Sequence, residues 1–352
     1  MPDASIRVKV ISKLPAATWL HQFPLGRPVW ADCEFVFDRD VREYDWLLVY
    51  DDLPAQTHES RKRSREPLGC PRAHTLLVTT EPSSVKIYGE DFTRQFGVVL
   101  TSQPEWALPH PHRIHAQPAL HWFYGLGADH VTPFDSIFAG PAETKTHDAS
   151  MVYSPKAMRH TLHYHRARFM RWLVGQMPEL DTFGRETPRK LDDKADCLNG
   201  YRYHIAIENF VGEHHWTEKL ADPFLGLSLP FYYGCPNAEQ YFPKDSFIRI
   251  DIRDPVGALE IIRNAIASNE YEKRLPALLE AKRRVMFEYN LFAVAAREIA
   301  ARHRPRERAR EGESILSRRA LRRSSPAVAW RDLVGKVRGR LRHLPGALSG
   351  KS

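Results

Sequence analysis

YRYHIAIENFVGEHHWTEKLADPFLGLSLPFYYG, residues 201–234, contains the clearest indication of the fold in this chain. Its start is rich in aromatic and aliphatic side chains, which predicts a strand ending near Glu208 and Asn209. A helix is expected over WTEKLADPFLG (216–226), and the apolar run SLPFYYG (228–234) predicts a second strand. Strand, helix and strand in this order are typical of a parallel sheet in an α/β protein.

Short apolar runs separated by turn-rich segments extend this pattern in both directions. The strands expected before it are IRVKVIS (6–12), CEFVFD (33–38), YDWLLVYDD (44–52), HTLLVTTE (74–81), FGVVLTSQ (96–103) and ASMVYSP (149–155). Further helices are expected through HYHRARFMRWLVGQM (163–177) and DPVGALEIIRNAIAS (254–268), with a strand at SFIRID (246–251) between the second of these and the opening stretch. We therefore expect two Rossmann-like domains, residues 1–148 and 149–300, and a basic tail over 301–352.

The formal charge of +8 on the 352 residues is concentrated at one end of the chain. Residues 301–352 hold fifteen Lys and Arg against four Asp and Glu, a net charge of +11, so the other 300 residues carry −3. A slightly acidic body does not favour a groove for a phosphate backbone. A basic nucleic-acid-binding protein therefore remains only a remote alternative, and no nucleic-acid partner is expected.

The same composition indicates where the protein is found. No run approaches the roughly 20 apolar residues of a membrane span, and the first residues lack the apolar core of a signal peptide. Four scattered cysteines, without the short spacings of a zinc or redox motif, are expected to be reduced thiols: Cys33, Cys70, Cys197 and Cys235. We expect a cytoplasmic protein.

The tail contains SSPAVAWRDLVGKVRGRLRHLPG (324–346), which predicts an amphipathic helix. Ser325 is suited to cap it and Pro326 to begin it. Apolar residues at helical spacing lie opposite several arginines: Trp330, Leu333, Val334, Val337, Leu341 and Leu344. Our hypothesis is peripheral attachment to an anionic membrane surface, such as the inner membrane face. Packing on the protein or a partner, or disorder, are the alternatives.

The opening stretch also gathers polar residues at one edge of the predicted sheet. Glu208 and Asn209 end a strand, and Glu218 and Lys219 lie in the first turn of the helix that follows. Ligands of open α/β sheets bind at the carboxyl ends of the strands. The N–H groups of a helix start favour an anion, and an adjacent lysine strengthens that preference. A phosphate site is expected here.

These residues carry a resemblance to a known family. YRYHIAIENFVGEHHWTEKL (201–220) and LPFYYGCPNAEQYFPKDSFIRIDI (229–252) resemble the carboxy-terminal signature of the α-1,3/4-fucosyltransferases, glycosyltransferase family 10, in order and spacing. DTFGR (181–185) is similar to that family's Gly-Arg turn. In the first half, TTEPSS (79–84), FGVVLTSQ (96–103) and HWFYG (121–125) resemble family segments more loosely.

The resemblance implies a GT-B enzyme that transfers fucose from GDP-fucose to a glycan acceptor with inversion, such as a lipopolysaccharide chain. By position, Asn209, Glu218 and Lys219 match the donor-binding residues of the family. Arg185 is the expected ligand of the diphosphate, and Arg189 is close enough in sequence to compete. The nearest alternative keeps this fold and uses another nucleotide-sugar donor.

One position departs from the family pattern. His215 stands where a tyrosine is common, and Trp216 replaces an aliphatic residue. A histidine still donates or accepts a hydrogen bond, and we expect it to bind the donor and to be able to titrate near neutral pH. The identity of the donor is therefore the property that we expect this substitution to affect most.

Inverting transfer needs a base that takes the proton from the acceptor hydroxyl. Glu81, at the end of a first-domain strand, is the candidate, with a carboxylate capping the turn TTEPSS as the alternative. Glu218 is the second catalytic candidate, either beside the developing positive charge or on the ribose hydroxyls. Its alternative is an ordinary first-turn carboxylate.

We expect no obligatory cofactor or metal. The acidic pairs Asp51–Asp52 and Asp192–Asp193 are typical of strand or helix ends, so Lys219 and Arg185 are expected to stabilise the leaving group instead. Six histidines could in principle bind a metal ion, but they lack the helical i, i+4 pairing of zinc enzymes. They are His110, His112, His115, His121, His214 and His215.

Overall fold

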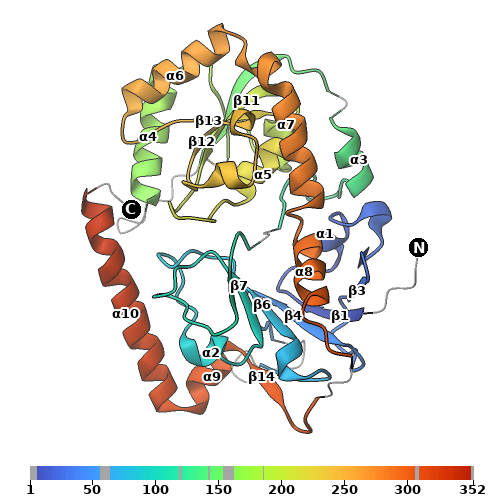
Figure 1. The fold of residues 1–352 in the computed structure, drawn as a ribbon. Coiled ribbons are helices and arrows are strands. Elements are labelled where there is room, and N and C mark those ends of the chain that lie inside the picture. The colour runs from blue at the N-terminus through green and yellow to red at the C-terminus, as the bar shows by residue number, and fades with distance from the viewer. Residues whose placement is uncertain are drawn as a thin grey trace. The chain divides into compact units, whose positions relative to one another are not determined.

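The structure, a computed structural model, describes residues 6–55, 64–118, 121–141, 143–153, 162–184, 186–305 and 309–349. It divides into two compact units, each built around its own sheet (Figure 1). Unit 1 comprises Met1–Phe23, Arg27–Pro118 and Leu291–Arg342, and unit 2 comprises Pro24–Gly26, Ala119–Asn290 and His343–Ser352.

Unit 1 holds a seven-stranded sheet that is parallel except at one edge. In hydrogen-bonding order its strands are β2 (Val29–Trp30), β3 (Cys33–Val36), β1 (Ile6–Ile11), β4 (Trp46–Tyr50), β6 (Thr75–Val78), β7 (Val98–Thr101) and β8 (Arg113–His115). β4, β6 and β7 are fully buried, as their continuous apolar sequences predict. A separate antiparallel pair joins β5 (Arg65–Pro67) to β14 (Ser314–Leu316).

The helices of unit 1 are α1 (Ala17–Leu20), α2 (Glu90–Thr93), α8 (Leu291–Ala300), α9 (Arg318–Ser324) and, up to Arg342, the long α10 (Pro326–Ser349). One core cluster combines Val49, Leu77 and Val99 of the central strands with Phe92 of α2 and Ile315 of β14. Residues from both ends of the chain thus share one core.

Unit 2 holds a five-stranded sheet whose pairings are all parallel. Its order is β10 (Asp181–Phe183), β9 (His147–Val152), β11 (Tyr201–Ile207), β12 (Leu229–Tyr233) and β13 (Ile248–Arg249). Its helices are α3 (Phe134–Ala139), α4 (His163–Gln176), α5 (Glu218–Leu225), α6 (Pro255–Ala267) and α7 (Glu270–Phe287). The predicted α/β class with two Rossmann-like sheets is confirmed.

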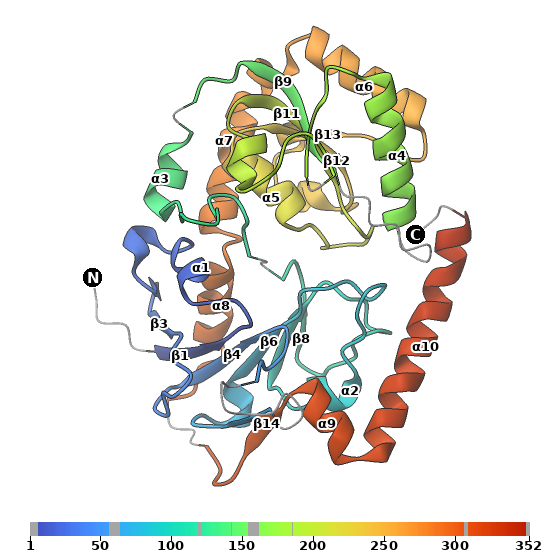
Figure 2. The same ribbon diagram turned by 180° about the vertical axis from the view of Figure 1, so that it is seen from behind.

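The order in which the chain adds strands to this sheet changes side between β9 and β11. From β9 it passes through α4 to β10 on one side, and from β11 it passes through α5 to β12 on the other. Figures 1 and 2 show α4 with α6 on one side of the sheet and α5 with α7 on the opposite side. A crevice outside the carboxyl ends of β9 and β11 is therefore the expected ligand position in such a sheet.

The division into units differs from the predicted boundary at residue 148, because the main segment of unit 2 starts at Ala119. The backbone N–H groups of Phe123 and Tyr124 donate to Asp222 Oδ1 at 3.1 and 3.3 Å, which ties this segment to α5. The division also differs from the predicted boundary at residue 300. Unit 1 resumes at Leu291, where Phe292 of α8 stacks on Phe23 with 4.0 Å between ring centroids.

The predicted tail is part of unit 1 up to Arg342, since β14, α9 and α10 pack there. The cysteines are free and buried, in agreement with the prediction of reduced thiols: Cys33, Cys70, Cys197 and Cys235. Within the part of the chain that the structure describes, no helix has the length and apolar character needed to cross a membrane.

Candidate functional site

The loop between β11 and α5 is held in place by the buried carboxylate of Glu208. Glu208 accepts hydrogen bonds from Thr217 N at 2.8 Å and from Thr217 Oγ1 at 2.7 Å. Burial raises the pKa of Glu208 to about 7, against the influence of the nearby Lys219. Glu208 therefore joins the end of the strand to the start of the helix across the intervening loop.

Thr217 is the N-cap of α5, and its Oγ1 accepts a hydrogen bond from Lys219 N at 3.3 Å. This cap satisfies one of the free N–H groups of the first turn. It also places Glu218 and Lys219 in that turn, as the sequence predicts. The Thr-Glu-Lys order thus has a structural reason in its first residue and leaves the next two for chemistry.

A cavity of about 280 Å³ lies where the topology predicts a ligand, beside the carboxyl-terminal parts of β9 and β11. Its walls include Val152 of β9, Ile207 of β11 and Met170 of α4. The charged and amide side chains that line it are Arg166, Lys194, Asn209, Glu218, Lys219 and Asp222. Three predicted donor-binding residues, Asn209, Glu218 and Lys219, are thus brought together.

Glu218 and Lys219 form an ion pair, with 2.6 Å between Oε1 and Nζ. Burial opposes the charge of Glu218, but the charge and hydrogen bond of Lys219 outweigh it and lower the pKa of Glu218 to about 2. Burial likewise opposes the charge of Lys219, and the carboxylates of Glu218 and Glu208 raise its pKa above the ordinary value. Both groups are therefore charged at neutral pH.

Two further cations of this cavity were not predicted. Arg166 is buried on α4, and Lys194 lies in the short 3₁₀ helix Lys194–Cys197, which Asp193 caps. The charge of Lys194 helps to lower the pKa of Glu218. Burial lowers the pKa of Arg166, and the carboxylates of Glu208 and Glu218 act in the opposite direction. A third cation beside Lys219 and Arg166 suits a ligand with more than one negative charge.

Asn209 presents an unused acceptor to the cavity. Its Oδ1 is buried and has no hydrogen-bond partner among the residues that the structure describes. A buried polar atom without a partner costs free energy, so such atoms usually have one in the functional state. A hydroxyl or N–H group of a ligand would supply the missing donor.

Asp222, one helical turn after Glu218 on α5, is buried and also lines this cavity. Oδ1 accepts the two backbone hydrogen bonds described above, whereas Oδ2 has no partner within the described ranges. Burial raises the pKa of Asp222 to about 7, despite the opposing charge of Lys194. Its charge therefore changes close to neutral pH.

The structure places two other predicted donor-binding residues, His215 and Arg189, outside the lining of this cavity. His215 is buried, and burial lowers its pKa to about 3, so the prediction that it titrates near neutral pH is wrong. Its ring meets Phe210 edge-on, with 5.3 Å between centroids, and it does not line the cavity. Arg189 is half-exposed and paired with Asp181 at 2.7 Å, also away from the cavity lining. Arg185 lies outside the described residues.

Gly184, beside Arg185 in the segment DTFGR, has a specific backbone role. Its φ of +147° is one that side chains rarely allow, and a Cβ there would lie 2.5 Å from Tyr153 O. The predicted turn is therefore partly a strand, since β10 (Asp181–Phe183) pairs with β9 immediately before this glycine. The glycine lets the chain pass close to the end of β9.

Glu81, the predicted base, follows β6 in unit 1 by three residues, at the carboxyl end of that strand. Its backbone oxygen accepts a hydrogen bond from Gln103 Nε2 at 2.7 Å, which holds the turn in place. Nearby, Asp51 accepts hydrogen bonds from Lys13, Lys86 and Tyr88. Burial disfavours its charge, but Lys86 and these bonds hold the pKa of Asp51 far below its usual range.

No three His, Cys, Asp or Glu side chains of the described part of the chain are grouped so as to hold a metal ion. The histidine segment has other contacts. His110 Nε2 lies 3.1 Å from Phe96 O, and its Nδ1 accepts a hydrogen bond from His112 N at 3.2 Å.

The segment that lines this cavity is similar in sequence to known proteins. Residues 142–270 match the family model of "Glycosyltransferase family 10 (fucosyltransferase) C-term", which confirms the family resemblance for this part of the chain. An α-(1,3)-fucosyltransferase, FucT, of Helicobacter pylori is 28% identical over 93 residues, 24% of this chain and 20% of the relative. The mouse 4-galactosyl-N-acetylglucosaminide 3-α-L-fucosyltransferase 9 is 28% identical over 97 residues, 26% of this chain and 27% of the relative.

These matches span about a fifth to a quarter of the length of the curated relatives. Among solved structures, an α1,3-fucosyltransferase crystallised with GDP-fucose aligns over 78% of this chain and 82% of its own, with 15% identity and a TM-score of 0.46. The GtfA/B complex aligns over 73% of this chain and 57% of its own, with 12% identity and a TM-score of 0.39.

Proposed function

We propose that this chain is a GT-B glycosyltransferase that moves fucose from GDP-fucose to a hydroxyl group of a glycan, with inversion at the sugar carbon. The observation that carries the proposal is the cavity of unit 2. It is formed by residues inside the matched family segment and combines three cations with an unused amide acceptor: Arg166, Lys194, Lys219 and Asn209.

The charges of the cavity fit a nucleoside diphosphate leaving group. As the sugar–phosphate bond breaks, negative charge grows on the diphosphate and positive charge on the sugar ring. Lys219 and Arg166 are placed to stabilise the first charge, with Lys194 as the third cation. Glu218, ionised through its pair with Lys219, is suited to the ring or to the ribose hydroxyls. Asn209 Oδ1 is suited to a hydroxyl or N–H group of the donor.

Glu81 is our proposed general base, which would take the acceptor proton as the hydroxyl oxygen attacks. The carboxyl end of a parallel strand is the usual place for such a group in an α/β sheet. The α-1,3 linkage named for the relatives supports an α-1,3 transfer, and we propose a surface polysaccharide or lipopolysaccharide as the acceptor.

Donor-dependent stabilisation tests this function. At roughly 100 times its dissociation constant, a ligand that binds only the folded state adds about 2.7 kcal/mol to the free energy of unfolding. We expect GDP and GDP-fucose to raise the melting temperature, and UDP-glucose and UDP-galactose to leave it unchanged. GDP-mannose tests whether the stabilisation depends only on the guanosine diphosphate or also on the fucose of the donor.

A second candidate function uses the same cavity with another donor. It rests on the departure of His215 and Trp216 from the sequence pattern of the family, although neither side chain lines the cavity. Stabilisation by a uridine sugar and not by GDP-fucose would favour it over our proposal. Stabilisation by GDP, with equal effects of GDP-fucose and GDP-mannose, would support the nucleotide and leave fucose without support.

A further inference from the structure

Helix α10 is attached to unit 1 by its polar and glycine-rich side. Asp332 is only 8% exposed and pairs with Lys336 at 2.6 Å and Arg322 at 3.3 Å. On the same side, a Cβ at Gly339 would lie 2.9 Å from Ile87 Cγ1, so the glycine lets this side chain lie against the helix. Arg331 pairs with Asp91 of α2 at 2.8 Å.

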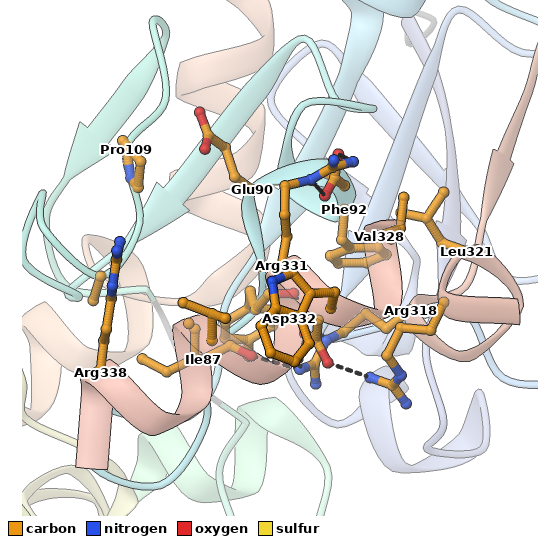
Figure 3. Close-up of a pocket in the computed structure, with 18 of the residues that line it drawn as sticks. Ile87, Glu90, Phe92, Pro109, Arg318, Leu321, Val328, Arg331, Asp332 and Arg338 are labelled. Carbon is orange, nitrogen blue, oxygen red and sulfur yellow. Dashed lines mark hydrogen bonds and ion pairs between the residues drawn. The ribbon is translucent and has the colours of Figure 1, made fainter. Parts of the chain in front are cut away.

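These contacts surround a cavity of about 400 Å³ between α10, α9 and α2. Figure 3 shows Arg318, Arg331, Asp332 and Arg338 around it, with Ile87 beside the helix. Charged residues and glycines of α10 thus face unit 1, together with the apolar Val328, Trp330 and Val334, which also line the cavity.

The opposite side of α10 is apolar and open. Leu333 is 51% exposed, Val337 47% and Leu341 59%, and none of them lines the cavity. Trp330 is 65% exposed and lies at the edge of this side, where it also borders the cavity. The spacing of three or four residues places all four in one line along a helix, about half a turn away from Asp332 and Gly339. We call these four residues the α10 stripe. A continuous apolar stripe of this kind on a soluble surface marks an interaction site.

Arginines flank the α10 stripe. Arg338, which also borders the cavity, and Arg340 are exposed and have no acidic partner among the residues described. Arg342 lies over the ring of Trp106 at 4.8 Å. The one acid between residues 331 and 342 is Asp332, which is buried and paired. The exposed charge beside the stripe is therefore positive, which complements an anionic surface.

We propose that the α10 stripe docks this protein on an anionic lipid bilayer. The helix would lie in the plane of the surface, with the four apolar side chains among the acyl chains and the arginine side chains reaching the phosphates. A tryptophan is suited to this position, because its ring is mainly apolar and its N–H group remains near the headgroups. The inference is independent of the transfer reaction, since its residues lie in unit 1 and the proposed donor cavity lies in unit 2.

Co-sedimentation of the full chain with vesicles tests the proposal. We expect binding to phosphatidylcholine vesicles that contain roughly 30% phosphatidylglycerol and much weaker binding to pure phosphatidylcholine. The double variant Trp330→Ser, Val337→Ser is expected to bind roughly 10- to 100-fold more weakly, since two apolar side chains no longer enter the lipid. Arg338→Gln, Arg340→Gln is expected to lose roughly 25-fold on anionic vesicles only.

Val256→Ser is the matched control, because Val256 is 67% exposed on α6 and outside the stripe. It should bind vesicles as the unchanged chain does. GDP affinity and melting temperature show whether each variant is folded, and unchanged vesicle binding by a folded stripe variant would overturn the proposal. A dimer in lipid-free solution that the stripe variant converts to a monomer, without vesicle binding, would assign the stripe to a contact between copies instead.

Discussion

At the scale of single residues, the cavity of unit 2 draws its charged side chains from three elements: α4, the 3₁₀ helix before β11, and α5. Asn209, Glu218 and Lys219 were predictable because a strand end and a helix start follow each other within ten residues. Arg166 and Lys194 were not predictable in this way. They lie 53 and 25 residues before Lys219 and reach the cavity from α4 and from the 3₁₀ helix before β11, so only the packed sheet brings them there.

His215 shows the opposite error at this scale. The ordinary pKa of histidine lies close to neutral pH, so the sequence allowed a ring that titrates there. The structure buries the ring, and desolvation favours the neutral form so strongly that the pKa falls to about 3. Burial is a property of the tertiary structure and is not visible in the local sequence.

Removal of the Lys219 charge should weaken nucleotide binding. A hydrogen bond to a charged group contributes roughly 1.5–3 kcal/mol, so we expect Lys219→Ala and Arg166→Ala each to lower GDP affinity by roughly 10- to 150-fold. Isothermal titration with GDP measures this. Lys244→Ala is the control, because Lys244 is an exposed lysine of the same unit outside the cavity lining. Full GDP affinity in Lys219→Ala would show that the phosphate ligand has been assigned wrongly.

At the scale of elements, the strands of four or more residues and helices α4, α5, α6 and α10 were predicted from apolar runs and end signals. Most of the shorter strands and the short helices α1, α2, α3 and α9 were not. The exceptions have physical causes. β10 is only three residues long and was read as part of a turn, because the pairing with β9 that makes it a strand is invisible in the sequence. The buried ion pair of Lys9 with Glu66, at 2.7 Å, likewise joins a central strand to β5 through residues that no local pattern connects.

The anchoring of α5 by Asp222 predicts a pH effect on stability. The pKa of this carboxyl rises from its ordinary value of 3.8 to about 7 in the folded chain, so the folded state binds the proton more tightly than the unfolded state. Its contribution to the free energy of unfolding is therefore present below about pH 4 and is lost as the pH rises to about 7.

The variant Asp222→Asn removes this titration and keeps an oxygen that accepts from Phe123 N and Tyr124 N. We expect the unchanged chain to lose roughly 1–3 kcal/mol more stability than the variant between about pH 5 and pH 7. Urea unfolding at a series of pH values measures the difference. Glu208, whose pKa is also raised to about 7, is present in both proteins and cancels from the comparison. Parallel stability curves would contradict the prediction.

At the scale of the whole molecule, the order of the chain does not match the order of the units. Prediction from sequence divided the chain once near residue 148 and again near 300, as if each unit were continuous. The chain instead returns to unit 1 at Leu291, because Phe292 packs with Trp19, Phe23 and Phe35 at the other end of the sequence. Contacts between residues so far apart leave no local signal.

This arrangement separates the proposed roles of donor binding and proton transfer, since Lys219 belongs to unit 2 and Glu81 to unit 1. Glu81→Gln keeps the size and polarity of the side chain but cannot accept the proton. We expect turnover to fall by roughly 10²- to 10⁴-fold while GDP affinity stays within about twofold of the unchanged chain. Initial rates with GDP-fucose and a glycan acceptor, together with GDP titration, measure the two quantities.

Lys219→Ala provides the converse case, with weaker GDP binding as its first effect. If Glu81 only caps its turn, Glu81→Gln will leave the turnover of the folded protein almost unchanged, because glutamine still offers a side-chain oxygen to the turn. Loss of turnover without loss of stability, in a variant that still binds GDP, is therefore the result that distinguishes a base from a cap.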